Sequence, residues 1–262
     1  MFSLVFPGQG SQTIGMGKDF FENYDLVKDL FKEADESLGA SLSKIILEGP
    51  KEKLDLTVNT QPAIFLISYS IFQVMKKEFN IDLDNAKYFA GHSLGEYSAL
   101  CAANYLSFSD TIKLLKTRGD AMQNAVPKGE GGMLAVLGSK VEIIEDLLNK
   151  NKNDFIAEIA NDNSEGQIVL SGKNNDIEKL RQLLKSKNIK NIKLPVSAPF
   201  HCHLMKNATE IMRNEIQKSN FQTSICLTSN VNCEFQTSNF KLQTCIVRTS
   251  SFHFLFDRLK VF

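Results

Sequence analysis

The chain has 262 residues, of which 43% are hydrophobic and 23% are charged, proportions typical of a globular protein with a sizeable core. Thirty basic and thirty acidic side chains cancel, so bulk charge favours neither a nucleic acid nor a membrane surface as a partner. No apolar run approaches the length of a membrane span, and the N-terminus lacks the features of a secretory signal. The five cysteines form no C-x-x-C pair, so we expect reduced thiols and a location in the cytoplasm or an organelle matrix.

The first residues predict a strand followed by a glycine-rich loop. A short apolar strand over residues 2–6 precedes the sequence Pro-Gly-Gln-Gly-Ser-Gln at residues 7–12. Such a loop can turn backbone N–H groups toward an oxyanion or a phosphate, and a plain strand-to-helix connection is an equal alternative. The dinucleotide-binding pattern Gly-x-Gly-x-x-Gly is not met, because Thr13 occupies its last position.

Three helices are predicted before residue 80. One covers residues 24–38, where apolar residues share a face, and a shorter one covers residues 42–47. The third extends from residue 59 to residue 79 and is apolar nearly all round, with Pro62 expected in its first turn. We expect this third helix to be central rather than superficial.

The sequence Gly-His-Ser-Leu-Gly at residues 91–95 points most directly to chemistry. Residues 87–90 predict a strand before it, and the small apolar residues 97–103 predict a helix after it. Gly-x-Ser-x-Gly between a strand and a helix is the nucleophile elbow, in which a serine hydroxyl is exposed on a tight turn at a helix N-terminus. Ser93 is therefore predicted to be catalytic, and the alternative is an ordinary glycine-rich turn.

The stretch after the elbow predicts a helix and then a separate unit. The helix begins near Ser109 and carries Arg118, for which spacing alone favours a solvated surface charge. After a linker at residues 127–132, the pattern predicts strand, helix, strand, strand, helix and strand, an order typical of a ferredoxin-like unit. These elements are predicted at residues 133–137, 140–149, 155–160, 167–170, 176–186 and 190–196. We expect this unit, residues 128–197, to be inserted into a larger α/β body made of residues 1–127 and 198–262.

A second group of candidate catalytic residues follows this unit, in the sequence Ala-Pro-Phe-His-Cys-His at residues 198–203. A histidine after a proline-bearing loop is well placed to act as a base. His201 and His203 would face opposite sides of an extended segment, and His92 is expected to point away from Ser93. No metal site is expected, because no further ligands cluster near the two later histidines.

Five sequences occur in order along the chain, and together they resemble one family. They are Phe-Pro-Gly-Gln-Gly-Ser-Gln at 6–12, Thr-Gln-Pro-Ala at 60–63, Gly-His-Ser-Leu-Gly-Glu-Tyr at 91–97, Thr-Arg-Gly at 117–119 and Ala-Pro-Phe-His at 198–201. They closely resemble the malonyl-CoA:acyl carrier protein transacylases of bacterial-type fatty acid synthesis. This resemblance implies an α/β fold with an α/β-hydrolase-like body and an inserted ferredoxin-like subdomain, in agreement with the predicted elements. It also implies transfer of malonyl from malonyl-CoA to the phosphopantetheine thiol of acyl carrier protein, without a cofactor, and we expect a monomer.

The resemblance assigns roles to five residues. It implies that Ser93 is the nucleophile that takes the malonyl group as an ester, and that His201 is its base. The backbone N–H groups of Gln9 and Leu94 are implied to form the oxyanion hole. Arg118 would hold the free malonyl carboxylate, which accounts for a preference for malonyl over acetyl.

Other interpretations stay open beside this one. A serine hydrolase or thioesterase could share the elbow, although Arg118 and Gln9 argue against it. Acyl carrier protein is acidic in general, so a basic patch is expected, with Lys113, Lys116 and Lys128 as candidates and a solvated face as the alternative.

The C-terminal sequence departs from the family after Asn232. The family continues with a segment that ends in Val-Arg-Gln and with a later Gly-Pro-Gly turn, whereas here Thr249 stands near that glutamine and no Gly-Pro-Gly occurs. The segment from Cys233 on shows no regular periodicity, and residues 250–256 are expected to be apolar and exposed. We expect an altered or truncated tail that leaves the body incomplete, which supports the alternative of a non-catalytic remnant.

Overall fold

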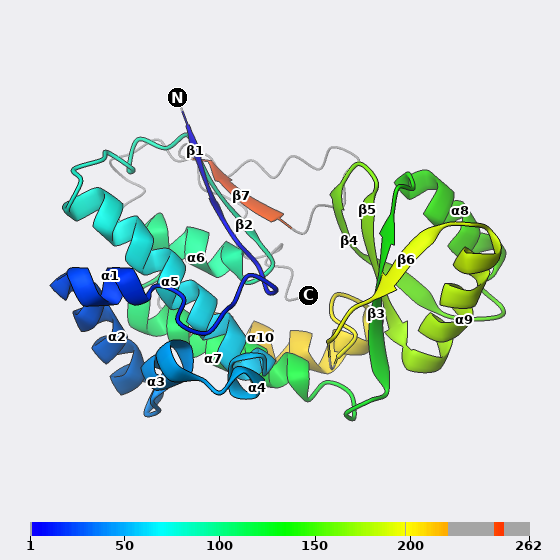
Figure 1. The fold of residues 1–262 in the computed structure, drawn as a ribbon, viewed down its shortest axis with the longest axis horizontal. Helices are drawn as coiled ribbons and strands as arrows, with labels where there is room; N and C mark the ends of the chain where they lie inside the picture. The colour runs from blue at the N-terminus through cyan, green and yellow to red at the C-terminus, as the bar shows by residue number, and fades with distance from the viewer. Residues whose placement is uncertain (1, 197, 220–243, 249–262) are drawn as a thin grey trace. The chain divides into compact units, whose positions relative to one another are not determined.

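The computed structural model describes residues 2–196, 198–219 and 244–248 (Figure 1). Of these, residues 2–120, 212–219 and 244–248 form one compact unit, and residues 121–196 and 198–211 form a second. The second unit contains the described part of the predicted insertion and also includes residues 121–127 and 198–211, which the sequence pattern assigned to the body. The physical reason is a shared core, because Phe200 and Met205 pack in one apolar cluster with Met133.

Helices dominate the part of the first unit that precedes residue 80. They are α1 (Lys18–Asn23), α2 (Asp25–Leu38), α3 (Leu42–Glu48), α4 (Lys51–Leu54) and α5 (Thr57–Lys77). The three predicted helices are confirmed as α2, α3 and α5, whereas α1 and α4 are too short to show a periodic pattern. In the described chain, no helix is both long and apolar enough to cross a bilayer.

Helix α5 is central to the first unit, as predicted, because Phe65, Leu66 and Val74 along its length are buried. The expectation that Pro62 lies in the first turn is wrong, because α5 begins at Thr57. Pro62 therefore lies inside the helix, where it lacks the N–H that would bond to the carbonyl of Val58.

A three-stranded sheet completes the first unit. Its order is β1 (Ser3–Phe6), β2 (Tyr88–His92) and β7 (Thr244–Arg248). The predicted strands β1 and β2 run parallel, and β7 pairs antiparallel with β2 (Figure 1). Strand β7 was not predicted, because pairing with β2 rather than a local pattern makes it a strand. The rest of the predicted tail after Asn232, Thr249 included, lies outside the described residues.

The second unit has the predicted order of strands and helices. Its elements are β3 (Gly131–Leu137), α8 (Val141–Lys150), β4 (Ala157–Ser164), β5 (Gln167–Lys173), α9 (Asn174–Ser186) and β6 (Lys190–Lys193). The sheet has the order β4-β5-β3-β6, and every neighbouring pair is antiparallel. Helix α8 connects β3 to β4, and helix α9 connects β5 to β6.

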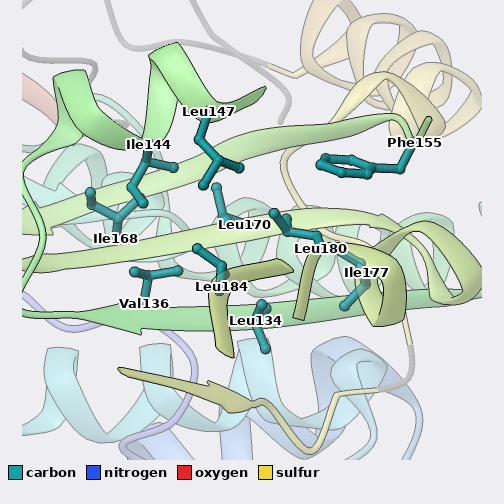
Figure 2. Packing of buried hydrophobic residues seen from close by; sticks show 10 residues of the cluster. All are labelled: Leu134, Val136, Ile144, Leu147, Phe155, Ile168, Leu170, Ile177, Leu180 and Leu184. Carbon is teal, nitrogen blue, oxygen red and sulfur yellow. The ribbon is translucent and has the colours of Figure 1, made fainter. Parts of the chain in front are cut away.

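Alternating residues of β3 and β5 cover the two faces of this sheet. On one face, Leu134 and Leu170 belong to one apolar cluster with Ile144 of α8 and Leu180 of α9, and Figure 2 shows these side chains between the strands and the helices. On the other face, Met133 and Val169 belong to the cluster that contains Phe200 and Met205. Both faces are therefore buried, and the second cluster joins residues 198–208 to the sheet.

The core between α8 and the sheet provides a test of this packing. Ile144 is 0% exposed, and its neighbour Ile143 on the same helix is 53% exposed. We expect Ile144→Ala to lower the free energy of unfolding by about 2–5 kcal/mol, because it leaves a cavity against the sheet. The matched change Ile143→Ala should stay within about 0.5 kcal/mol. Urea denaturation of both variants measures the difference, and equal losses would contradict this core.

Candidate active site

Ser93 lies on a strained turn between β2 and α6 (Gly95–Ala102), and this confirms the predicted strand-to-helix context. Its φ angle of 55° is in the left-handed region. For a residue with a side chain this conformation costs about 1–2 kcal/mol. Strain of this kind persists only where the surroundings impose it, and it concentrates at functional sites.

Two glycines let the strand and the helix meet closely enough to impose that turn. A Cβ atom on Gly91 would lie 1.9 Å from the carbonyl carbon of Gly95. A Cβ atom on Gly95 would lie 2.4 Å from the carbonyl oxygen of Phe6, at the end of β1. No side chain fits at either position, so the pattern Gly-x-Ser-x-Gly is a requirement of packing as well as a sequence motif.

The loop after β1 lies beside the elbow. A Cβ atom on Gly8 would lie 2.4 Å from Nδ1 of His92, so the His92 ring faces this loop. Gln9 follows in sequence, and its side-chain amide donates a hydrogen bond to Oγ1 of Thr57 at 3.4 Å. The structure thus brings the loop that carries Gln9 to the residue that precedes Ser93, while Leu94 follows Ser93 directly. The role of Gln9 and Leu94 in an oxyanion hole stays a prediction.

Arg118 is buried against Ser93, contrary to the solvated charge that its spacing favoured. It lies on α7 (Phe108–Gln123) and is only 2% exposed. Its Nη2 donates to Oγ of Ser93 at 3.2 Å, and its Nη1 donates to Oε1 of Gln61 at 2.8 Å. Its guanidinium carbon also lies 5.7 Å from the centre of the Tyr97 ring. Local spacing could not predict this, because burial depends on where α7 packs.

A close approach of α7 to the start of α5 positions Arg118. A Cβ atom on Gly119 would lie 2.5 Å from the carbonyl oxygen of Thr57, so the two helices touch through their backbones. Burial lowers the pKa of Arg118, while Tyr97 and Glu96 act to raise it. Burial also raises the pKa of Tyr97 to about 12. The phenol therefore stays neutral at physiological pH, and the guanidinium is a cation because arginine is not deprotonated in proteins.

Gln61 is a residue of this site that the sequence pattern did not identify. It lies on α5, is 1% exposed and accepts the hydrogen bond from Arg118. It lies in the motif Thr-Gln-Pro-Ala at residues 60–63, which carried the family resemblance but was given no role, in a helix that is otherwise largely apolar. That motif does not say which side chain Gln61 meets.

His201 belongs to the second unit, whereas Ser93, Arg118, Gln9 and Leu94 belong to the first. The pairing of His201 with Ser93 therefore stays a prediction. His201 is buried and has a φ angle of 61°, so it too occupies a strained turn.

The segment around His201 is not extended, so the assumption that placed His201 and His203 on opposite sides is wrong. Cys202 donates through Sγ to the carbonyl of Pro199 at 3.1 Å, and His203 begins the 3-10 helix η1 (His203–Met205). The His203 backbone N–H donates to Glu158 at 3.2 Å, and its ring contacts the same carboxylate. Burial raises the pKa of the Cys202 thiol, which disfavours the thiolate that a nucleophile would need.

Comparison with known proteins places this arrangement in a family. Residues 3–250 match the family described as the acyl transferase domain. The malonyl CoA-acyl carrier protein transacylase of Haemophilus influenzae is 39% identical over 249 residues, which are 94% of this chain and 79% of that protein. The chain belongs to the malonyl CoA-acyl carrier protein transacylase family. The resemblance carried by the five sequence motifs is thereby confirmed.

Solved structures of transacylases share the mixed α/β fold. The acyl-carrier-protein S-malonyltransferase from Bartonella henselae has a TM-score of 0.80 and 43% identity, over 84% of this chain and 71% of that one. A malonyl-transacylase in complex with a type II PKS acyl-carrier protein has a TM-score of 0.79 and 37% identity, also over 84% and 71%. At 43% and 37% sequence identity, both structures resemble this chain in sequence as well as in fold.

The close contact at Gly95 predicts a large effect of a single methyl group. We expect Gly95→Ala to lower the free energy of unfolding by about 3 kcal/mol or more, because the new carbon overlaps the backbone of β1. Gly15→Ala is the control, since Gly15 has a φ of +76° and nothing within 4 Å of an added Cβ. Its cost should be backbone strain alone, about 1–2 kcal/mol. Urea denaturation measures both, and similar losses would argue against the tight approach.

Proposed function

We propose that this chain transfers malonyl from malonyl-CoA to the phosphopantetheine thiol of acyl carrier protein, through a malonyl ester of Ser93, in fatty acid biosynthesis. The observation that carries the proposal is the buried guanidinium of Arg118, whose Nη2 lies 3.2 Å from Oγ of Ser93. A carboxylate that reaches this cation gains charge-assisted hydrogen bonds, which are stronger than those to a neutral acceptor. Malonyl supplies such a group, because its free carboxylate lies one methylene beyond the carbonyl that the serine attacks.

In the first half-reaction, His201 takes the proton from Oγ of Ser93 as Oγ attacks the thioester carbonyl. The N–H groups of Gln9 and Leu94 stabilise the oxyanion that forms. When the intermediate collapses, the carbon–sulfur bond breaks and the coenzyme A sulfur receives the proton from His201. In the second half-reaction the thiol of the carrier protein attacks the ester, and the same steps run in reverse. A thioester and a serine ester are similar in energy, so the transfer is reversible.

The contact between Arg118 and Ser93 is compatible with both roles. A hydroxyl has two acceptor lone pairs and one donor hydrogen. Since the guanidinium only donates, it occupies a lone pair of Oγ and leaves the hydroxyl hydrogen for the base. The incoming malonyl carboxylate then replaces a weak neutral acceptor with an anionic one, and fork-to-fork pairing favours this exchange.

The proposed fold is an α/β-hydrolase-like body, residues 1–127 and 198–262, with a ferredoxin-like subdomain inserted at residues 128–197. Support for the body comes from the elbow between β2 and α6. Support for the subdomain comes from its antiparallel order β4-β5-β3-β6 with both helices packed on one face. We further propose a monomer in the cytoplasm or an organelle matrix.

The expected basic patch for the carrier protein also stays a proposal. Lys113 and Lys128 are exposed. Lys116 is less available, because it is half-buried and donates to Oδ1 of Asn59 at 3.0 Å. The first two are therefore the better candidates for contacts with an acidic partner.

The covalent intermediate gives the first test. Wild-type protein mixed with radiolabelled malonyl-CoA should take up a stoichiometric label in a burst, whereas Ser93→Ala should show background counts. Ser98→Ala is the matched control, since Ser98 is a buried serine on α6, the helix that follows Ser93. Undiminished labelling of Ser93→Ala would overturn the proposal. Release of free malonate without carrier protein, at the rate of transfer, would favour a hydrolase or thioesterase, and an unlabelled wild type would favour a non-catalytic remnant.

Selectivity for the diacid gives the second test. We expect Arg118→Ala to lower kcat/KM for malonyl-CoA relative to acetyl-CoA by about a hundredfold or more, because the substrate carboxylate loses its buried partner. Arg181→Ala, at a half-buried arginine of α9, is the control and should leave this ratio unchanged. A ratio that does not respond to Arg118→Ala would exclude this residue as the carboxylate site.

A further inference from the structure

We propose that Gln61 determines specificity by holding the Arg118 guanidinium through a neutral oxygen, which leaves the positive charge of Arg118 for the carboxylate of the acyl group. This inference rests on the function proposed above. Gln61 does not itself react. It orients the guanidinium of Arg118 and adds no negative charge beside it.

The contact is short, buried and supplied by two different helices. Nη1 of Arg118 donates to Oε1 of Gln61 at 2.8 Å, and the two side chains are 2% and 1% exposed. Both groups are shielded from water, and this hydrogen bond on Nη1 together with the one from Nη2 to Ser93 orients the plane of the guanidinium. A fixed plane is what bidentate recognition of a carboxylate requires.

The position of Gln61 is itself held by its neighbours on α5. The single hydroxyl hydrogen of Thr60 is shared between the carbonyl of Leu54, 2.5 Å from Oγ1, and that of Leu56, 3.1 Å from it. The start of α5 is therefore locked to the segment before it, and Gln61 presents its oxygen from a rigid support.

Because the Gln61 oxygen is neutral, the hydrogen bond from Arg118 leaves the net charge of the site unchanged. A carboxylate at position 61 would accept the same hydrogen bond, but it would form a buried ion pair with Arg118 and cancel its charge. It would also repel the malonyl carboxylate, since like charges in a shared buried site disfavour each other. Glu96 already acts on Arg118, as the upward influence on the Arg118 pKa indicates. A second carboxylate would leave the site with excess negative charge.

The same pair of helices contains a second amide-to-cation contact that serves as a built-in control. Nζ of Lys116, on the same helix as Arg118, donates to Oδ1 of Asn59 at 3.0 Å. This contact joins α5 to α7 in the same manner, but its cation is not the one that contacts Ser93. If the amides merely fasten the helices together, a carboxylate at either position should have the same consequence.

The experiment compares kcat/KM for malonyl-CoA and acetyl-CoA in wild type, Gln61→Glu, Gln61→Met and Asn59→Asp. Gln61→Glu changes the charge with almost no change in shape, and should lower the malonyl-to-acetyl ratio at least about tenfold, mainly through KM for malonyl-CoA. Gln61→Met removes the acceptor without adding charge, and should lower the ratio by a smaller factor. Asn59→Asp should leave the ratio within about twofold of wild type.

Three results would overturn the inference. They are an unchanged ratio in Gln61→Glu, an equal fall in Asn59→Asp, or equal losses for both substrates in the Gln61 variants, which would indicate a structural role alone. If Gln61→Glu does not fold, an unchanged ratio in Gln61→Met would overturn the inference in its place. A wild-type chain that takes up no malonyl at all would instead overturn the proposed function, and this inference with it.

Discussion

The first unit is organised around a cation buried beside a serine on a strained turn. Removing a guanidinium from water costs several kcal/mol unless its donors are satisfied, and here Gln61, Ser93 and the ring of Tyr97 surround it. Three helices must therefore converge, because α5 carries Gln61, α7 carries Arg118 and α6 follows Ser93. The same convergence that stabilises the cation also places it at the point where an acyl group would be attached.

Glycines at three positions set the distances of this convergence. Gly91 and Gly95 let β2 and α6 meet around Ser93, and Gly119 lets α7 touch the first turn of α5. At each of these positions a Cβ atom would overlap backbone, which cannot move aside as the end of a flexible side chain can. The geometry of the site is thus fixed by main-chain contact, and the polar side chains are built on that rigid support.

The second unit holds a histidine in an unfavourable backbone conformation. His201 has a positive φ angle and is buried. On one side of it, Phe200 packs in the cluster that contains Met133, and on the other side Met205 packs in the same cluster. Between them, Glu158 binds the start of η1. Strain at a single residue can persist because its neighbours on both sides are anchored to β4 and the rest of the sheet.

Local patterns determined a large part of this protein. The apolar face of α2, the long apolar run of α5, the order of elements from β3 to β6 and the strand-to-helix context of Ser93 all follow from residues that are close in sequence. The structure confirms them. Tertiary packing decided the rest. Arg118 is spaced like a surface charge, and its burial depends on Gly119 meeting Thr57, more than fifty residues earlier. Gln61 belongs to the site only because Arg118 donates a hydrogen bond to it. Strand β7 forms only through its pairing with β2. Residues 198–208 join the second unit through their packing on the face of its sheet opposite α8 and α9. Each of these features is a contact between segments remote in sequence, which no pattern within either segment records.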